Sequence, residues 1–104
     1  MRRARFLASV RADFLAILTY IAESTGSVAV GETFVAKLRA KCHALAALQA
    51  TIGRPRPELR PDIRSFPYGS YVIYFRYIEG RFEVVRILER HLDIDSNYGG
   101  FDPP

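Results

Sequence analysis

The chain has 104 residues, 49% of them hydrophobic, which is typical of one globular domain with a modest core. Its formal net charge is +4 and 13 of its 15 basic residues are arginines, which permits an anionic partner but also fits a GC-rich genome. The longest apolar run, Val72–Phe75, is too short to span a membrane, and charges interrupt the apolar residues near the start, so neither a membrane segment nor a signal peptide is expected.

Residues 2–8 are expected to form a short first strand whose basic start suits the edge of a sheet. Ser9 is a good N-cap for the helix that follows, because its hydroxyl can accept a hydrogen bond from a free backbone N–H. From Val10 onward apolar residues recur every three or four positions. Gly26 is expected to end this helix.

A second helix is predicted over about residues 29–50, with Ser27 or Thr25 as its cap. Gly31 weakens its first turn, so the helix could begin as late as residue 31 or 32. Short connections make the two helices an antiparallel hairpin.

The cysteine and the histidines give no sign of a metal or cofactor site. Cys42 is the only cysteine and cannot form an internal disulfide, which favours a reducing, cytoplasmic location. It falls in the apolar stripe of the second helix and is expected to be a buried core residue. His43 has no acidic or histidine neighbour one turn away and is expected at the surface. His91 is the other histidine.

Three prolines between residues 54 and 61 predict an extended, stiff connector rather than a helix or a central strand. Its arginines could bind phosphate or carboxylate groups. The simpler interpretation is a solvated loop whose charge is partly balanced by Glu58 and Asp62.

A β-hairpin is predicted from residues 70–78 and 81–88, which are rich in β-branched and aromatic residues. A short strand at residues 63–66 precedes it. The connection Glu79-Gly80 fits a tight two-residue turn, which would place Arg76 opposite Glu83 as a cross-strand ion pair. Both faces of this hairpin are largely apolar, whereas a sheet with one solvated face should alternate apolar with polar residues.

The expected architecture is therefore α+β, in the order β-α-α-β-β-β, with the helical hairpin packed on one face of a small antiparallel sheet. The helices have enough apolar surface to cover one sheet face only, so something else must cover the second.

The chemistry of the sequence is sparse, since no nucleophile–base–acid set and no phosphate-binding glycine motif can be found. A possible target- or phosphate-binding set is Arg64, Arg86, Arg90 and His91, with Tyr71 nearby. Such a set could in principle cleave RNA, with the 2′-hydroxyl as nucleophile. Arg86 could equally pair with an acidic group of a partner.

Four stretches give the chain a resemblance to the ParE toxins of the ParE/RelE superfamily, found in bacterial type II toxin–antitoxin modules. They are ASVRADFLAILTYIAEST, the second-helix run at 34–48, GRPRPELRPDIRSFPYGSYVIYFRY and FEVVRILERHLDID. The match spans about residues 5–95, so residues 1–95 are interpreted as one toxin domain and residues 96–104 as a tail.

The resemblance implies a cytoplasmic toxin without cofactor or metal that inhibits DNA gyrase and is not an enzyme. It also implies a ParD-like antitoxin, which would cover the second sheet face, and contact with DNA only through that antitoxin. The expected antitoxin-binding residues are Tyr71, Ile73, Phe75, Phe82, Val84 and Leu88. Alternatively, the antitoxin would lie along the groove between the helices and the sheet.

The resemblance leaves a second function open, because RelE members cut mRNA on the ribosome. In this alternative Arg64, Arg86 and His91 would be catalytic. Where RelE-like nucleases carry a catalytic arginine at the start of the hairpin, this chain has Tyr71, which counts against nuclease activity. A third interpretation is an inert relative that only binds the antitoxin.

Overall fold

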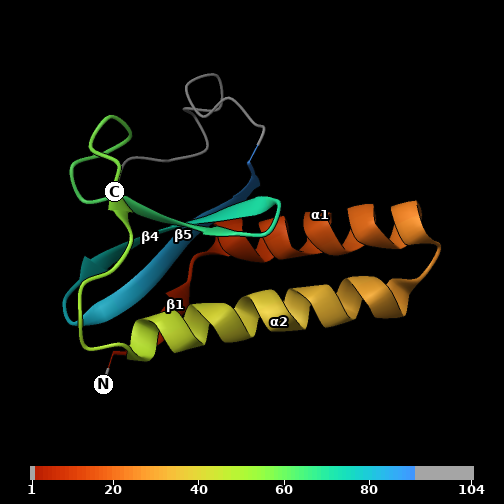
Figure 1. Cartoon of the computed structure of the whole chain (residues 1–104), viewed down its shortest axis with the longest axis horizontal. Helices are drawn as coiled ribbons and strands as arrows, with labels where there is room; N and C mark the ends of the chain where they lie inside the picture. Colours follow the sequence, from red (N-terminus) through yellow and green to blue (C-terminus); the bar gives the residue numbers. More distant parts are fainter. Residues whose placement is uncertain (1, 91–104) are drawn as a thin grey trace.

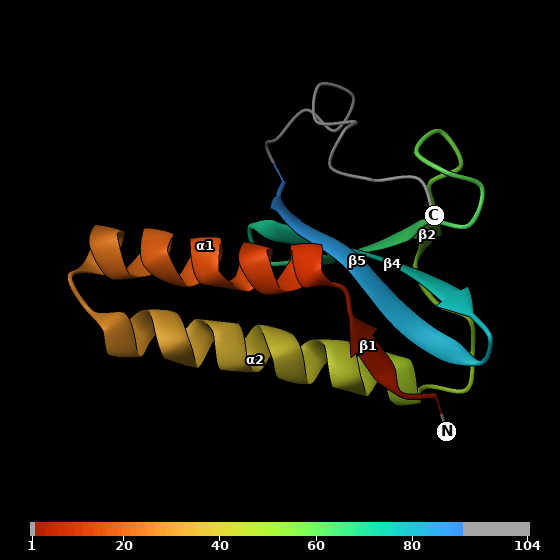
Figure 2. The same ribbon diagram turned by 180° about the vertical axis from the view of Figure 1, so that it is seen from behind.

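The computed structural model describes residues 2–90, in which two helices cover one face of a five-stranded sheet (Figure 1). The elements are β1 (Ala4–Phe6), α1 (Ala8–Thr25), α2 (Val28–Ala47), β2 (Arg54–Pro55), β3 (Arg64–Tyr68), β4 (Tyr71–Ile78) and β5 (Arg81–Glu89). The expected order of elements is confirmed, with the two-residue strand β2 added at the edge. Turned by 180°, the view shows the tip of the helical hairpin extending past the sheet (Figure 2).

The sheet is mixed, not antiparallel as expected, because β1 pairs with β5 in parallel. The strand order is β1-β5-β4-β3-β2, and the other pairs are antiparallel. β1 pairs with the free edge of β5, the last strand, although the two helices and the other strands lie between them in the sequence. No tight turn links the two strands, so no turn forces them to run in opposite directions.

Beyond the end of β1, side chains of α1 supply the hydrogen bonds that β5 lacks. Ser9 was expected to cap the helix, but the N-cap is Leu7, and the Ser9 hydroxyl donates to the carbonyl oxygen of Val85 (2.9 Å). One turn later, a carboxylate oxygen of Asp13 accepts from the backbone N–H of Ile87 (2.9 Å). Side chains of α1 therefore satisfy backbone groups on the edge of β5 that β1 leaves unpaired.

The helical hairpin closes as predicted at its turn, but α2 begins earlier than Gly31. Gly26 ends α1 in a left-handed conformation (φ 74°), and the Ser27 hydroxyl accepts from the N–H of Val30 (3.2 Å). A Cβ atom at Gly31 would lie 2.8 Å from the backbone oxygen of Leu18. This glycine therefore permits close contact between the two helices and does not mark a helix start.

The β4–β5 turn is the predicted two-residue turn. Glu79 and Gly80 both have positive φ angles, 51° and 73°, as a type I′ turn requires. Arg76 lies opposite Glu83, and its Nε donates to Glu83 Oε1 at 2.8 Å, which confirms the predicted ion pair.

A β-bulge changes the strand register a few residues beyond this turn. Phe75 pairs with Val84, but Tyr74 pairs with Arg86, so Val85 is an extra residue in β5. The expected pairing therefore holds only next to the turn. Beyond the bulge, the residues of β5 are shifted by one relative to β4.

The helices cover the sheet face that was expected to be open. The sheet residues buried there are at most 2% exposed: Ile73, Phe75, Phe82, Val84 and Ile87. They pack against the helical residues Val10, Phe14, Ile17, Leu38, Cys42 and Leu45. The interpretation of this face as uncovered was wrong, because alternation shows that two faces are apolar without showing which one the helices meet.

The other face is covered by the proline-rich connector. Leu59 and Ile63 pack with Tyr74, Val85 and Leu88 in a second cluster, in which each residue is at most 8% exposed. Figure 1 shows this connector on the side of the sheet away from the helices. Leu88, expected on the open face, belongs to this cluster because of the bulge. The chain itself therefore covers both faces of the hairpin.

The predictions for the cysteine and the neighbouring histidine are confirmed. Cys42 is fully buried among the core residues, and burial raises the pKa of its thiol to about 12. His43 is exposed and contacts the ring of Phe6 edge-on, with 5.4 Å between ring centroids.

Candidate functional site

Arg64 holds the loop after α2 against the sheet. Its Nε donates to the carbonyl oxygen of Ile52 (2.8 Å) and its Nη2 to that of Gly53 (3.0 Å). Gly53 has a φ of 89°, and a Cβ atom there would lie 2.6 Å from the ring of Phe75. Arg64 thus binds two carbonyl groups at a point where the loop lies tightly against the core.

Arg86 forms a two-point ion pair with Asp13. Its Nε lies 2.9 Å from Asp13 Oδ2 and its Nη2 lies 3.0 Å from Asp13 Oδ1. Asp13 is only 8% exposed and also accepts from the N–H of Ile87. A two-point arginine–carboxylate pair is strong and geometrically specific. Arg86 therefore does pair with an acidic group, but the group belongs to α1 of the same chain.

Arg90 fastens the end of β5 to the β3–β4 turn. Its Nη1 donates to the carbonyl oxygen of Gly69 (3.2 Å), and its backbone N–H donates to that of Ser70 (2.8 Å). Its side chain is exposed. His91, the fourth member of the predicted set, lies outside the described residues.

The predicted arginines do not form one open cationic face. Arg64 is in β3 and Arg86 is in β5, with β4 between them. Arg64 binds carbonyl groups after α2, whereas Arg86 binds a carboxylate on α1. Within residues 2–90, no group of three His, Cys, Asp or Glu side chains could hold a metal ion, and no helix is long and apolar enough to cross a membrane.

A groove separates the two helices from the start of β4 and the end of β5. It consists of two adjoining hollows, of about 360 and 300 Å³, which share Tyr20, Tyr71 and Glu89. Ile21 and Phe34 complete the apolar part of the larger hollow. We refer to these five residues as the helix–sheet groove. Its location agrees with the alternative prediction of a groove between helices and sheet.

Aromatic rings form most of the groove. The rings of Phe34 and Tyr71 lie 5.6 Å apart between centroids, and Tyr20 is 63% exposed. Burial raises the pKa of Tyr71, and Glu89 and Tyr20 raise it further, so its hydroxyl is a neutral hydrogen-bond donor at neutral pH. Tyr71 was a predicted site residue. Tyr20 was missed, because a tyrosine on an amphipathic helix carries no local sign of exposure.

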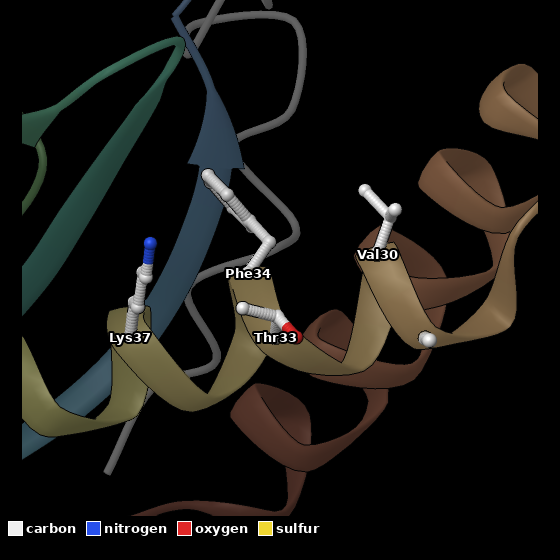
Figure 3. A pocket seen from close by; sticks show the side chains of 5 residues that line it. Val30, Thr33, Phe34 and Lys37 are labelled. Carbon is white, nitrogen blue, oxygen red and sulfur yellow. The ribbon is translucent and has the colours of Figure 1, made fainter.

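The apolar surface continues from the groove along α2. A hollow of about 370 Å³ is lined by Ala29, Val30, Thr33, Phe34 and Lys37, and Figure 3 shows Phe34 projecting toward the sheet. Val28 and Val30 are 59% and 49% exposed. The helical hairpin thus presents apolar side chains where it extends past the sheet.

Comparison with known proteins gives consistent matches. The family model described as "ParE toxin of type II toxin-antitoxin system, parDE" matches residues 4–93. Proteins named Toxin ParE1 from Mycobacterium tuberculosis strains CDC 1551 / Oshkosh and ATCC 25618 / H37Rv are each 40% identical to this chain over 63 residues. That match covers 58% of this chain and 64% of each relative, so the chain matches less than two thirds of their length.

A solved structure has a similar fold. The structure titled "Chromosomal ParDE TA system from P. aeruginosa" superposes with a TM-score of 0.76, covering 86% of this chain and 96% of that one. The sequences are 18% identical, so this likeness shows the fold alone. The overall fold of the helical hairpin and sheet is therefore shared with a solved structure.

Proposed function

Because the chain belongs to the family of ParE toxins of type II toxin–antitoxin systems, we propose that it binds and inhibits DNA gyrase in the cytoplasm and is neutralised by a ParD-like antitoxin. The observation that supports binding over RNA cleavage is the pairing of Arg86 with Asp13. The alternative function, a ribosome-dependent endoribonuclease, needs this arginine on a scissile phosphate.

A catalytic arginine must be free to approach the charge that develops on the phosphate. Arg86 would have to leave a carboxylate that is only 8% exposed, and that buried charge would then keep only the N–H of Ile87 of the partners described above. Arg64 would have to release two carbonyl oxygens that it holds next to the core. Both arginines therefore serve the fold in this structure.

Two assays on the purified toxin test the target. We expect inhibition of gyrase supercoiling and no mRNA cleavage on ribosomes. Because Arg86→Ala would also remove a structural ion pair, His91→Ala is the better variant for testing cleavage. Site-specific mRNA cuts that disappear in His91→Ala would contradict the proposal and favour the endoribonuclease. Arg90 and His91 remain candidates for contact with the target.

We further propose that the antitoxin lays the apolar side of an amphipathic segment into the helix–sheet groove. Of the six residues expected to bind it, four are fully buried under the helices: Ile73, Phe75, Phe82 and Val84. They could reach a partner only if the helices separated from the sheet. Tyr71 remains accessible, and Tyr20 and Phe34 join it in a mostly aromatic surface. Aromatic anchors of this kind carry much of the binding energy in protein interfaces.

Two exposed residues of α1 offer a matched test of the groove. Tyr20 is 63% exposed and lines the groove, whereas Leu15 is 66% exposed and lines neither of its hollows. Tyr20→Ala should weaken antitoxin binding by about 1–3 kcal/mol, roughly 10- to 100-fold, and Leu15→Ala should leave it unchanged. Titration calorimetry with the cognate antitoxin measures both. Equal affinities for the two variants would place the antitoxin elsewhere.

A further inference from the structure

Three arginines surround a polar hollow at the end of the sheet that carries the β4–β5 turn. The hollow, of about 410 Å³, is lined by Arg3, Ala4, Arg5, Glu79, Gly80 and Arg81. It lies at the opposite end of β5 from the helix–sheet groove, which includes Glu89. None of these arginines belongs to the set singled out from the sequence.

The parallel pairing of β1 with β5 brings these arginines together. Ala4 packs against the helix-side core, so its neighbours Arg3 and Arg5 point to the outer face of the sheet. Arg5 is in register with Glu83, and Arg81 precedes Glu83 by two residues on the same face. Residues separated by more than 70 positions in the sequence thus share one surface.

The three guanidinium groups are unengaged. In the described part of the chain none of them has a hydrogen-bond or ion-pair partner, and Arg3, Arg5 and Arg81 are all exposed. Arg2 differs, since it donates to two backbone oxygens after α2 and lies over the ring of Tyr77 at 4.5 Å. Glu79 is the one acidic residue that lines the hollow, so its lining carries a surplus of positive charge.

The composition of the hollow indicates the chemistry of its ligand. Arginine presents a planar set of donors that fits phosphate oxygens. The lining has no aromatic side chain on which bases could stack, as single-stranded nucleic acid requires. Its only apolar side chain is that of Ala4, so it offers no pocket for the anchor of a protein partner. Backbone phosphates of a duplex bind arginines and need neither an aromatic stacking surface nor an apolar pocket, so they fit this lining.

We propose that Arg3, Arg5 and Arg81 contact the phosphate backbone of duplex DNA. The choice of DNA rests on the proposed function, because gyrase holds duplex DNA and a toxin bound to it lies near that duplex. Residues 2–90 contain all fifteen basic and eight of the eleven acidic residues, a formal charge of +7, which favours approach to DNA. This proposal differs from the expectation that DNA is reached only through the antitoxin.

Two double variants with the same change in net charge test the proposal. R5Q/R81Q removes two arginines of the hollow, whereas R11Q/R54Q removes exposed arginines of α1 and of β2, at the opposite edge of the sheet. Binding of the free toxin to a fluorescein-labelled duplex is measured by anisotropy across a salt series. For three phosphate contacts, the wild-type affinity should fall about 40-fold between about 50 and 200 mM salt. R5Q/R81Q should lower the salt slope by about 2, and R11Q/R54Q should leave it unchanged.

Equal losses of DNA affinity in the two double variants would overturn the proposal, because they would indicate that the net charge of the protein, and not a local site, attracts the DNA. A loss of antitoxin affinity in R5Q/R81Q with no loss of DNA affinity would also overturn it and indicate a protein partner. Supercoiling assays separate this proposal from the proposed function. A wild type that inhibits gyrase without binding DNA overturns the phosphate surface alone. A wild type that binds DNA through these arginines but never inhibits gyrase supports the surface and overturns the gyrase proposal.

Discussion

The two faces of the sheet are both apolar, but they are covered in different ways. On one face, α1 and α2 bury Ile73 and Phe75 completely. On the other, an irregular connector places Leu59 and Ile63 over Tyr74. The first cover is a pair of helices with regular hydrogen bonds along their length, whereas the second is an irregular segment held by a few backbone hydrogen bonds among Arg56, Leu59, Arg60 and Ile63.

An ion pair ties the second cover to the sheet. Arg76 extends over the outer face and binds both Glu83 (2.8 Å) and Asp62 of the connector (3.0 Å). Arg56 pairs with Glu58 within the connector at 2.6 Å. A short proline-stiffened segment that an ion pair ties to the sheet at Asp62 can therefore bury a sheet face. An excess of apolar residues in a small sheet does not by itself indicate a partner's binding surface.

The largest loss of stability is expected at the helix-covered face. Ile73→Ala should lower the free energy of unfolding by about 4 kcal/mol, toward the upper end of the range for such changes, because two packed helices cannot collapse into the cavity. Urea denaturation followed by circular dichroism measures this. A loss below about 1 kcal/mol would show that the helix layer is not rigid.

The thiol of Cys42 reports on the same layer without a mutation. Its pKa is raised from 9.0 to about 12 in the folded protein, so the stabilisation from the buried neutral thiol is complete below pH 9 and is lost as the pH rises toward 12. At about pH 8.5, a disulfide reagent should react roughly a thousandfold more slowly with folded than with urea-unfolded protein. Rapid labelling of the folded protein would mean that the helices separate from the sheet.

Ile63→Ala makes the matched change in the connector itself. Ile63 is 1% exposed, nearly as buried as Ile73, but the irregular segment that carries it can move into the space. The expected loss is about 2 kcal/mol, the lower end of the range for such changes. Urea denaturation under the same conditions gives the comparison. A loss as large as that of Ile73→Ala would show that the two covers are equally rigid.

The ion pairs of Arg76 should contribute less than the apolar contacts of the connector. Glu83→Gln keeps the shape of a side chain that is 7% exposed but removes the charge facing Arg76, and should cost about 1–2 kcal/mol. Glu58→Gln, at an exposed pair, is the control and should cause no measurable change in thermal stability. Similar losses in both variants would contradict the role given to Arg76.

The smallest effect is expected at the β4–β5 turn, outside both covers. Glu79 has a φ of 51°, which asparagine adopts more easily than glutamate. Glu79→Asn should raise the free energy of unfolding by about 0.5 kcal/mol, by analogy with other changes that relieve turn strain. Thermal denaturation tests this, and a decrease would show that the Glu79 side chain has a role that the structure does not reveal.

The sequence by itself determined the elements with local signatures. Helical spacing gave the two helices, Gly26 and Ser27 gave their turn, and Glu79-Gly80 gave the hairpin with its Arg76–Glu83 pair. These features depend on residues a few positions apart, where backbone geometry constrains the pattern directly. The burial of Cys42 followed from the same spacing.

Only the tertiary structure decided which side of the sheet the helices cover and which arginines remain free. Alternation marks two apolar faces symmetrically, so the face under the helices could not be chosen from it. The bulge at Val85 turns the residues at the end of β5 to the opposite faces of the sheet. The parallel pairing of β1 with β5 brings the arginines of these two strands together. Arg86 pairs with Asp13, which is 73 positions away in the sequence, and Arg5 and Arg81, which are 76 positions apart, line the same hollow. Contacts between such distant residues leave no local pattern, because the fold alone brings them together.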